Sequence, residues 1–403
     1  MSNKSRPATL VRDVSPPPLR KHTTAPTAPV GSEQNEQRDH PPSKSEAAAI
    51  EAHEVFIKDH LTYFVQHLST ALRPCSGPRI TIEHYRELYL RNQHAKGTHF
   101  VIHQHDHPIS GVHYDLRLQF SETSSASWAI PYGLPGNANS LRPNRMAIET
   151  RVHNLWNNLI ESASHATGSL LIWDTGEYEV LDRPQHNHTR TTDDELSEAE
   201  EETARYEAQN ERLIKAFQSR HIHLRLHGSR LPQGYTIALR LPSHNDRSSQ
   251  PKKPARKRHR IAPAKTRKTD VTTTSEDESD KGPKVTSPQE EALEDDHIDA
   301  ANASEDDGDA TIRANNAYAG ATNTIGSIHQ RHWFVTLDRP NSGFRRIRSG
   351  PESGRWVGPW ETFHVLGREH ERSIVTGRLA DEVMADEGVK KFVGRKMWRP
   401  ITE

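Results

Sequence analysis

The chain has 403 residues, of which 32% are hydrophobic and 27% charged, and its formal net charge is -1. One cysteine, Cys75, excludes an internal disulfide framework and a cysteine-based zinc site, and it fits a reducing compartment. No apolar run approaches the roughly 18 residues of a membrane span, and no secretory signal is recognisable. We therefore expect a soluble, non-secreted protein in which much of the chain lies outside a packed core.

Two segments have the composition of disorder. Residues 1–42 are rich in Pro, Ser, Thr and charge, and residues 243–325 alternate basic and acidic blocks. Within the second segment, KKPARKRHR (252–260) fits a nuclear localisation signal or a nucleic-acid tether, and a solvated charge run is the less favoured alternative. The sequence thus predicts a disordered tail and a long charged linker.

Helical signals precede and follow a region of strands. Ser43 and Glu46 have capping-box spacing, which predicts a helix that begins there and ends before Pro74. Further helices are expected over 81–93, in the acidic stretch 185–209, and from Leu379 to Glu387.

Short strands punctuated by turns fill the middle of the chain, which predicts a mainly β fold, either a barrel or a sandwich. The first two strands lie in 99–118 and turn at Pro108 to Gly111. Later strands are expected in 127–133, in 144–153, as a pair in 168–181 turning at Asp174 to Gly176, as a hairpin in 221–242, and in 332–339 and 360–367.

The segment HFVIHQHDHPISGVHYDLRL (99–118) concentrates chemistry on one face. Side chains alternate along a strand, so His113, Asp115 and Arg117 point one way and Tyr114, Leu116 and Leu118 the other. Val101, His103 and His105 share a face of the preceding strand. Imidazole and carboxylate together suit a divalent metal, and arginine suits a phosphate. An ordinary exposed face remains the alternative, because the chain has 26 histidines.

Several ordered motifs resemble one family, the 3′-phosphoesterase domain found at the N-terminus of bacterial DNA ligase D and as stand-alone proteins. The motifs are HQHD followed by VHYDLRLQ, SWAIPYG, NRMAIETRVHNLWN, GSLLIWDTG, LRLHGSRLPQGYTIALRL and HWFVTLDR, which together cover 99–242 and 332–339. Residues 340–403 resemble an extension of fungal proteins of this type.

The resemblance implies a compact β-barrel with flanking N-terminal helices and long disordered segments. It divides the chain into a tail (1–42), a helical segment (43–98), the first part of the barrel (99–242), a linker inserted in that domain (243–325), and the closing strand with its extension (326–403). It also implies a metal-dependent enzyme that removes a 3′-terminal ribonucleoside and then the 3′-phosphate from DNA, usually with Mn²⁺.

Site residues carry over by motif position. His113 and Asp115 match metal ligands of the family. The first ligand histidine is His105 by strand alignment, which we prefer, or His107 by distance from His113. Three nitrogen and oxygen ligands suit Zn²⁺ as well as Mn²⁺. The remaining matches are catalytic: Arg117 to a phosphate-contacting arginine, Arg145 to a second arginine, and His153 to a further essential histidine.

The chain also departs from the family pattern. Tyr132 stands where the family has a lysine, and Asn157 stands where it has a tyrosine, although the adjacent Trp156 is aromatic. The family's N-terminal Arg-Asp and Glu are not recognisable near Arg91 and Asn92.

Three functions follow as hypotheses. The first is a DNA 3′-end-processing phosphoesterase in nuclear repair, which acts on primer-template ends alongside a separate DNA ligase or other repair factors and not at a membrane. We expect no ligase activity, since the chain lacks a nucleotidylated-lysine motif. The second is a catalytically weakened nucleic-acid-binding or scaffold protein of the same fold. The third is a hydrolase of a small phosphorylated molecule, which competition by DNA would disfavour.

Overall fold

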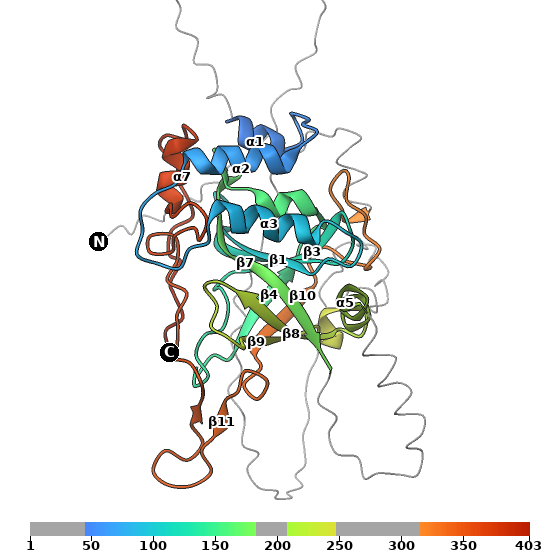
Figure 1. Cartoon of the computed structure of the whole chain (residues 1–403). Coiled ribbons are helices and arrows are strands. Elements are labelled where there is room, and N and C mark those ends of the chain that lie inside the picture. Colours follow the sequence, from blue (N-terminus) through green and yellow to red (C-terminus); the bar gives the residue numbers. More distant parts are fainter. Residues whose placement is uncertain (1–44, 183–207, 247–314) are drawn as a thin grey trace, which may run out of the picture. The chain divides into compact units, whose positions relative to one another are not determined.

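A computed structural model describes residues 45–182, 208–246 and 315–403 (Figure 1). The predicted tail, most of the acidic stretch and most of the linker, with its basic cluster 252–260, lie outside these ranges. Among the described helices, none has the length and apolar character needed to cross a membrane.

The core of the fold is a closed antiparallel β-barrel, as the sequence predicts. Eight strands follow one another around the barrel in the order β1, β2, β3, β4, β10, β9, β8 and β7, and β7 pairs with β1 to close it. Their bounds are β1 His99–His107, β2 Gly111–Gln119, β3 Ser124–Ile130, β4 Asn144–Glu149, β7 Gly168–Leu181, β8 His221–Gly228, β9 Thr236–Arg240 and β10 His332–Leu337. Two short strands, β5 (His153–Asn154) and β6 (Ser162–Ser164), extend the sheet at β3 and β7.

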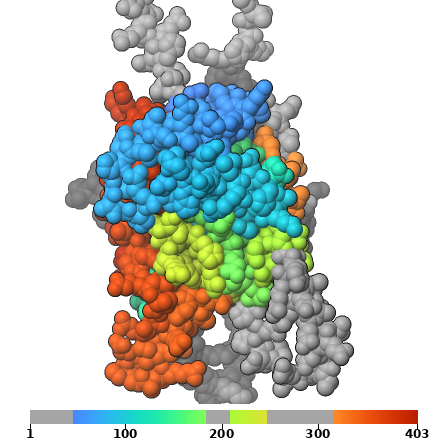
Figure 2. Space-filling view, viewed as in Figure 1, coloured from blue at the N-terminus to red at the C-terminus, as the bar shows by residue number. Residues whose placement is uncertain are grey.

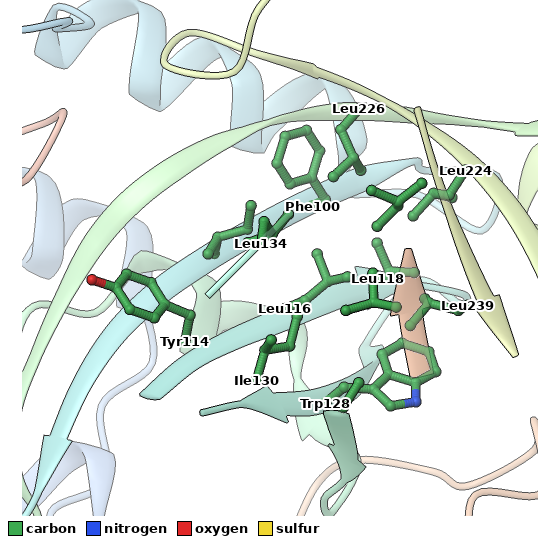
Figure 3. Close-up of a cluster of buried hydrophobic side chains, with 14 of the residues drawn as sticks. Phe100, Tyr114, Leu116, Leu118, Trp128, Ile130, Leu134, Leu224, Leu226 and Leu239 are labelled. Carbon is green, nitrogen blue, oxygen red and sulfur yellow. The ribbon is translucent and has the colours of Figure 1, made fainter. Parts of the chain in front are cut away.

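Alternating side chains fill the barrel interior. Leu116, Leu118 and Trp128 converge there with Leu224 and Leu239 from the opposite wall (Figure 3). Because side chains on a strand alternate between faces, burying Tyr114, Leu116 and Leu118 directs the intervening residues to the outer face of β2. That alternation positions the polar residues of the 99–118 segment outside the barrel.

Three N-terminal helices cover part of this outer face (Figures 1 and 2): α1 (Glu46–Glu51), α2 (His60–Thr70) and α3 (Ile82–Asn92). Phe64, Leu68 and Tyr85 pack with Val101 and Ile172 of the barrel in a second apolar core.

The first of the predicted helices is corrected by the structure. It is interrupted, because the Asp59 side chain caps a new helix at Thr62 N, and its N-cap is Ser45 instead of Ser43.

The pair of strands expected in 168–181 is a single strand, β7, and this prediction was wrong. Asp174 does not lie in a turn. Its buried carboxylate accepts hydrogen bonds from the backbone N–H groups of Thr175, Ser229, Arg230 and Leu231. Gly176 allows β8 to approach, since a Cβ there would lie 2.0 Å from the carbonyl oxygen of His227. Asp174 and Gly176 therefore serve packing, although in the sequence the same two residue types look like a turn signal.

Residues 315–325, part of the predicted linker, pack on the barrel. Ala317 forms a parallel bridge with Val152, and the Ile325 side chain is fully buried. β10 then inserts between β4 and β9, so the strand predicted at 332–339 closes the barrel next to β9 despite its distance in the sequence.

The C-terminal segment that follows β10 packs along the barrel (Figures 1 and 2). Residues 360–367 do not form the expected strand, and the regular elements here are β11 (Arg345–Arg346), β12 (Trp356–Val357) and helix α7 (Ala380–Asp386). Arg378 and Glu161 are both completely buried and lie 3.0 Å apart between side-chain atoms Nη2 and Oε2. Glu371 accepts a hydrogen bond from Trp173 Nε1 at 2.7 Å. The extension is thus built into the core.

The remaining elements lie beside the barrel. α5 (Gln209–Gln218) packs Leu213 and Phe217 into the main core, and two short 3-10 helices, η1 (Leu155–Leu159) and η2 (Ser243–Asn245), complete the fold.

Candidate functional site

The β1–β2 hairpin brings the predicted metal ligands together. His105 lies opposite His113, and His103 lies opposite Asp115 in the strand register. One ligand atom from each of His105, His113 and Asp115 lies within 4.8 Å of the others. His105 Nδ1 is 3.4 Å from Asp115 Oδ2, and His113 Nε2 is 3.5 Å from Asp115 Oδ1. These distances exceed the usual hydrogen-bond range, so the three groups converge without closing on one another.

Backbone carbonyls orient the two imidazoles. His105 Nε2 lies 2.8 Å from the carbonyl oxygen of Thr167, and His113 Nδ1 lies 2.9 Å from that of Gly111. A carbonyl oxygen only accepts, so each of these ring nitrogens carries the proton. The lone pairs of His105 Nδ1 and His113 Nε2 are then directed toward Asp115, which is the arrangement that metal-binding histidines adopt. The donor set fits a divalent ion.

The surroundings favour the metal-binding protonation states of Asp115 and His113. At His105 burial lowers the pKa, but Asp115 outweighs burial and raises that pKa above its ordinary value. Burial by itself raises the pKa of Asp115, but His113, His105 and Arg117 outweigh it and hold that pKa well below its ordinary value. Burial lowers the pKa of His113. An ionised carboxylate and a neutral imidazole are the forms that bind a metal.

Arg117 lies next to the ligands on β2 and is only 4% exposed. Its Nη2 is 3.7 Å from Asp115 Oδ2, and its Nη1 donates to the carbonyl oxygen of Asn157 at 3.2 Å. Among the described residues, Arg117 Nε, His103 Nδ1 and His153 Nδ1 are buried without a hydrogen-bond partner. Other buried atoms of the described residues are unsatisfied too, but these three belong to residues next to the candidate metal centre, where phosphate oxygens would give the donors among them a partner.

His153 belongs to this group, since its pKa responds to Arg117, Asp115 and His105. Burial is the largest effect and lowers the pKa of His153 well below 6.5, and the positive charge of Arg117 adds to it. At neutral pH the imidazole is therefore uncharged, with one nitrogen able to donate and the other able to accept.

Two other predicted residues are not members of the ligand group, although the His107 ring lies 5.5 Å from that of His105 between centroids. Arg145 has its Nη1 on the carbonyl oxygen of Arg142, and the groups that shift its pKa, after burial, are Tyr235 and Arg142. The structure does not bring it to the three ligands. His107 is outside the ligand group. Its Nδ1 instead accepts from the N–H groups of Ile109 and Ser110 at 3.2 Å each, which holds the β1–β2 turn.

Two residues near the site have no signal in the local sequence. Glu51, the last residue of α1, accepts a hydrogen bond from Ser162 and contributes to the electrostatics of His105 and Arg117. Tyr318 has its ring centroid 4.8 Å from that of His153. Both come from segments distant from the hairpin, so only the tertiary structure identifies them.

The departures from the family pattern also have defined places. Tyr132 follows β3 and is 44% exposed, and Asn157 is buried and uses its carbonyl to hold Arg117. Arg91 and Asn92 lie in α3, where both donate to Glu177, at 2.8 and 2.9 Å.

Comparisons with known proteins agree with the motifs. The family model for the DNA ligase D 3′-phosphoesterase domain matches residues 103–239. The "Multifunctional non-homologous end joining DNA repair protein LigD" of Mycobacterium tuberculosis is 34% identical over 97 residues, or 23% of this chain and 12% of that protein. The LigD protein of Mycolicibacterium smegmatis is 32% identical over 101 residues, or 22% of this chain and 12% of that protein. The match thus spans about an eighth of the relatives' length. The barrel, the ordered motifs and these matches agree, so residues 103–239 are similar to the DNA ligase D 3′-phosphoesterase domain.

Proposed function

We propose that this chain is a metal-dependent phosphoesterase that removes 3′-ribonucleoside and 3′-phosphate ends from DNA during repair, without ligase activity. The observation that carries the proposal is the convergence of His105, His113 and Asp115 within 4.8 Å, inside the segment that matches the phosphoesterase family. The family supports a role in processing DNA 3′ ends, and the donor set supports dependence on a metal.

In this proposal His105, His113 and Asp115 hold the ion. Nitrogen and oxygen donors without a thiolate suit Mn²⁺ or Zn²⁺, and we propose Mn²⁺ from the resemblance to the phosphoesterase family. When bound, a divalent ion supplies Lewis-acid polarisation of the phosphorus centre. The carbonyls of Thr167 and Gly111 keep both imidazoles in the orientation that binding needs.

Arg117 and His153 then act on the phosphate. The Arg117 guanidinium neutralises negative charge on the phosphate oxygens, and its buried Nε supplies a hydrogen bond that no described residue uses. His153 is neutral, so it orients the phosphate through one ring N–H and accepts a proton at the other nitrogen. Arg145 matches the family motif, but nothing in the geometry of the site supports a direct role for it.

The partners and location are proposed from the same family and from the sequence. We propose DNA 3′ ends as substrate, with ligation left to a separate DNA ligase or other repair factors. The relatives are named as end-joining repair proteins, and this chain matches a small part of them. Nuclear location is proposed from the basic cluster 252–260 alone.

End processing tests the proposal. Purified protein is incubated with a labelled primer-template that ends in one 3′-ribonucleotide, and with another that ends in a 3′-phosphate, in Mn²⁺, Zn²⁺, Mg²⁺ or chelator. We expect trimming that needs the metal and is abolished by His113→Ala. His227→Ala is the matched control, because that imidazole lies on β8 with its side chain 55% exposed. Equal trimming by His113→Ala and wild type would refute the assigned ligand.

A weakened nucleic-acid-binding or scaffold protein is the second candidate. The observations that favour it are Tyr132 and Asn157, which stand where the family has a lysine and a tyrosine, so that the family's lysine cation is missing here. Under this alternative the protein binds primer-template but shows no turnover with any metal, and metal content is substoichiometric. The same assay, with binding measured in parallel, separates the two candidates.

A further inference from the structure

Four rings form a continuous row that begins at His153, and we call these four the aromatic wall: Tyr318, His53, Trp156 and His60. The Tyr318 ring is nearly parallel to His53 at 6.4 Å between centroids, His53 meets Trp156 edge-on at 5.3 Å, and Trp156 stacks on His60 at 4.1 Å. The Tyr318 end contacts His153 at 4.8 Å. The row therefore leads away from the candidate phosphate site.

The backbone fixes Tyr318 at its place in the wall. Val152 N donates to the carbonyl oxygen of Asn316 at 2.9 Å, and Tyr318 N donates to that of Val152 at 3.0 Å. Asn154 Nδ2 adds a hydrogen bond to the carbonyl oxygen of Ala319 at 2.8 Å. These hydrogen bonds attach residues 316–319 to the strand that carries His153. They therefore fix the backbone of Tyr318 next to the candidate phosphate site.

The other rings lie on or next to elements that pack in the second apolar core, and Trp156 itself contacts that core. Trp156 is on η1, whose Leu155 and Leu159 are buried in that core. His60 is the first residue of α2, which Asp59 caps. His53 lies in the connection between α1 and α2. Three separate stretches of chain thus converge to present rings beside one another.

The wall has the character of a binding surface. Trp156, Tyr318 and His60 are only partly buried, and His53 is exposed, whereas the tryptophans of the barrel core, Trp128, Trp173 and Trp333, are fully buried. Arg151 lies over Tyr318, with its guanidinium carbon 5.7 Å from the ring centroid. Partial burial of the rings lowers the pKa of both His53 and His60 below the ordinary value, so these imidazoles are mostly neutral at pH 7. Neutral, partly exposed rings with one flanking cation suit a nucleobase next to a phosphate.

We propose that the aromatic wall stacks the nucleobase of the 3′-terminal nucleotide while its phosphate lies at Arg117 and His153. This inference rests on the proposed function. It adds a binding surface for the nucleobase, whereas the candidate metal centre, with Arg117 and His153, binds the phosphate. Every base has a π-face, so such a wall binds a terminal nucleotide without selecting its sequence. A wall of rings that only anchors the N-terminal helices is the competing explanation.

Binding in chelator tests the wall without turnover. The probe is a primer-template with 2-aminopurine at its 3′-terminal nucleotide, whose fluorescence is quenched by stacking. We expect wild type to quench it and to bind roughly 5- to 150-fold more tightly than Trp156→Leu or Tyr318→Leu, the range for loss of one base–aromatic stack. Trp156→Tyr, which keeps a ring, should restore most of the quenching. Trp356→Leu is the control, because that ring lies in β12 under Arg339, at 5.2 Å.

Turnover supplies the second arm. Wild type should trim a terminal ribonucleotide that bears a base faster than an abasic one, and the wall variants should treat both alike while matching wild type on the abasic end. This pattern also excludes misfolding, since a misfolded variant loses both substrates. If the wall variants quench 2-aminopurine as wild type does and keep its preference for the end that bears a base, the proposal that the wall stacks the base is overturned. Absence of trimming by wild type would overturn the proposed function alone, since the binding arm still decides on the wall.

Discussion

The choice between His105 and His107 shows how residue-scale geometry separates two chemically identical side chains. Both lie on the same face of β1, two residues apart. His105 has one nitrogen on a carbonyl and the other toward Asp115, whereas His107 Nδ1 accepts the N–H groups of the turn. Burial, followed by His105 and His113, lowers the pKa of His107 to about 4, which makes it a neutral acceptor in that turn.

This difference gives a prediction for metal content. His105→Ala should lose stoichiometric binding of Mn²⁺, because one of three donors is removed and Asp115 and His113 remain as an incomplete set. His107→Ala should keep stoichiometric metal. Its free energy of unfolding should fall only modestly, because the turn loses one side-chain acceptor. Metal analysis after dialysis against limiting Mn²⁺ measures both. Retention by His105→Ala with loss by His107→Ala would reverse the assignment.

The sequence could predict part of the site at this scale. Period-two alternation within one hairpin is a local property, so His113, Asp115 and Arg117 could be placed on a common face without the fold. Glu51 and Tyr318 could not be placed, since their proximity depends on how α1 and the segment after residue 314 pack on the barrel. Arg145 was matched by motif, but its environment depends on which face of β4 enters the barrel.

At the scale of elements, the buried, neutral imidazole of His99 connects its own strand β1 to η1 and β7. Its Nδ1 lies 3.0 Å from Asn158 Nδ2 of η1, and its Nε2 lies 3.1 Å from Thr175 Oγ1 of β7. Burial lowers the pKa of His99 from 6.5 to about 3. The folded protein therefore excludes a proton that the unfolded chain takes up below pH 6.5.

The linkage fixes the sign of a pH effect. Because the unfolded state binds more protons, the contribution of His99 is present above pH 6.5 and is lost as the pH falls toward about 3. His99→Gln removes this titration, so its free energy of unfolding should fall less steeply over that window, by up to about 1.4 kcal/mol per pH unit. Urea unfolding at several pH values measures the slopes. Parallel slopes for the two proteins would show that His99 is not excluded from protonation.

The ion pair Glu161–Arg378 attaches the C-terminal segment to the barrel wall. Both side chains are fully buried, and Glu161 also accepts hydrogen bonds from Thr376 and Ser373. Arg378→Met leaves a buried carboxylate without its cation, and we expect it to lower the free energy of unfolding by about 3–5 kcal/mol. Arg355→Met is the matched control. Its partner Glu352 is 56% exposed, so the expected change is below about 1 kcal/mol. Similar losses in chemical denaturation for the two variants would contradict this reading of burial.

Helices and strands could be predicted where local sequence patterns determine them. The predictions failed where residues with the same pattern serve tertiary packing instead. The hairpin of β8 and β9, the helix α3 and the strand β10 agree with the alternation and capping patterns that predicted them. The β7 turn was wrong because the Asp-Gly signal serves buried hydrogen bonds and close strand approach. Residues 360–367 have strand-like composition but form no strand, and Phe363 N donates to the carbonyl oxygen of Gly136, in a loop, at 3.2 Å.

At the scale of the whole molecule, the barrel is closed by a strand that follows a long insertion. The two ends of the insertion are held in one region, because Arg331 pairs with Asp246 at 3.7 Å and with Glu149 at 2.7 Å. Ser327 donates to the same Glu149, at 2.6 Å, and Asn316 donates to Ser327, at 2.9 Å. Arg331 thus links Asp246, which precedes residues 247–314, to the buried carboxylate of Glu149, which binds the segment after them.

This arrangement predicts that a short connection is sufficient. Replacing residues 250–312 with about 20 Gly and Ser residues, which span about 25 Å as a flexible chain, should preserve the barrel. Because loop-closure entropy grows slowly with length, the free energy of unfolding should change by only about 1 kcal/mol, in the stabilising direction. Thermal and chemical unfolding measure this, and Glu149→Gln in the shortened chain should destabilise it as strongly as in the full chain.

The same replacement also separates catalysis from targeting. It removes the basic cluster 252–260 but leaves the candidate metal centre and the aromatic wall intact. The proposed trimming of short primer-templates should therefore persist, whereas the proposed nuclear accumulation of a tagged protein should be lost. Restoring 252–260 alone within the Gly and Ser connection should return the protein to the nucleus. A shortened chain that fails to fold would instead show that the inserted segment contributes to the core, because the two anchored ends would then be insufficient to bring β10 between β4 and β9.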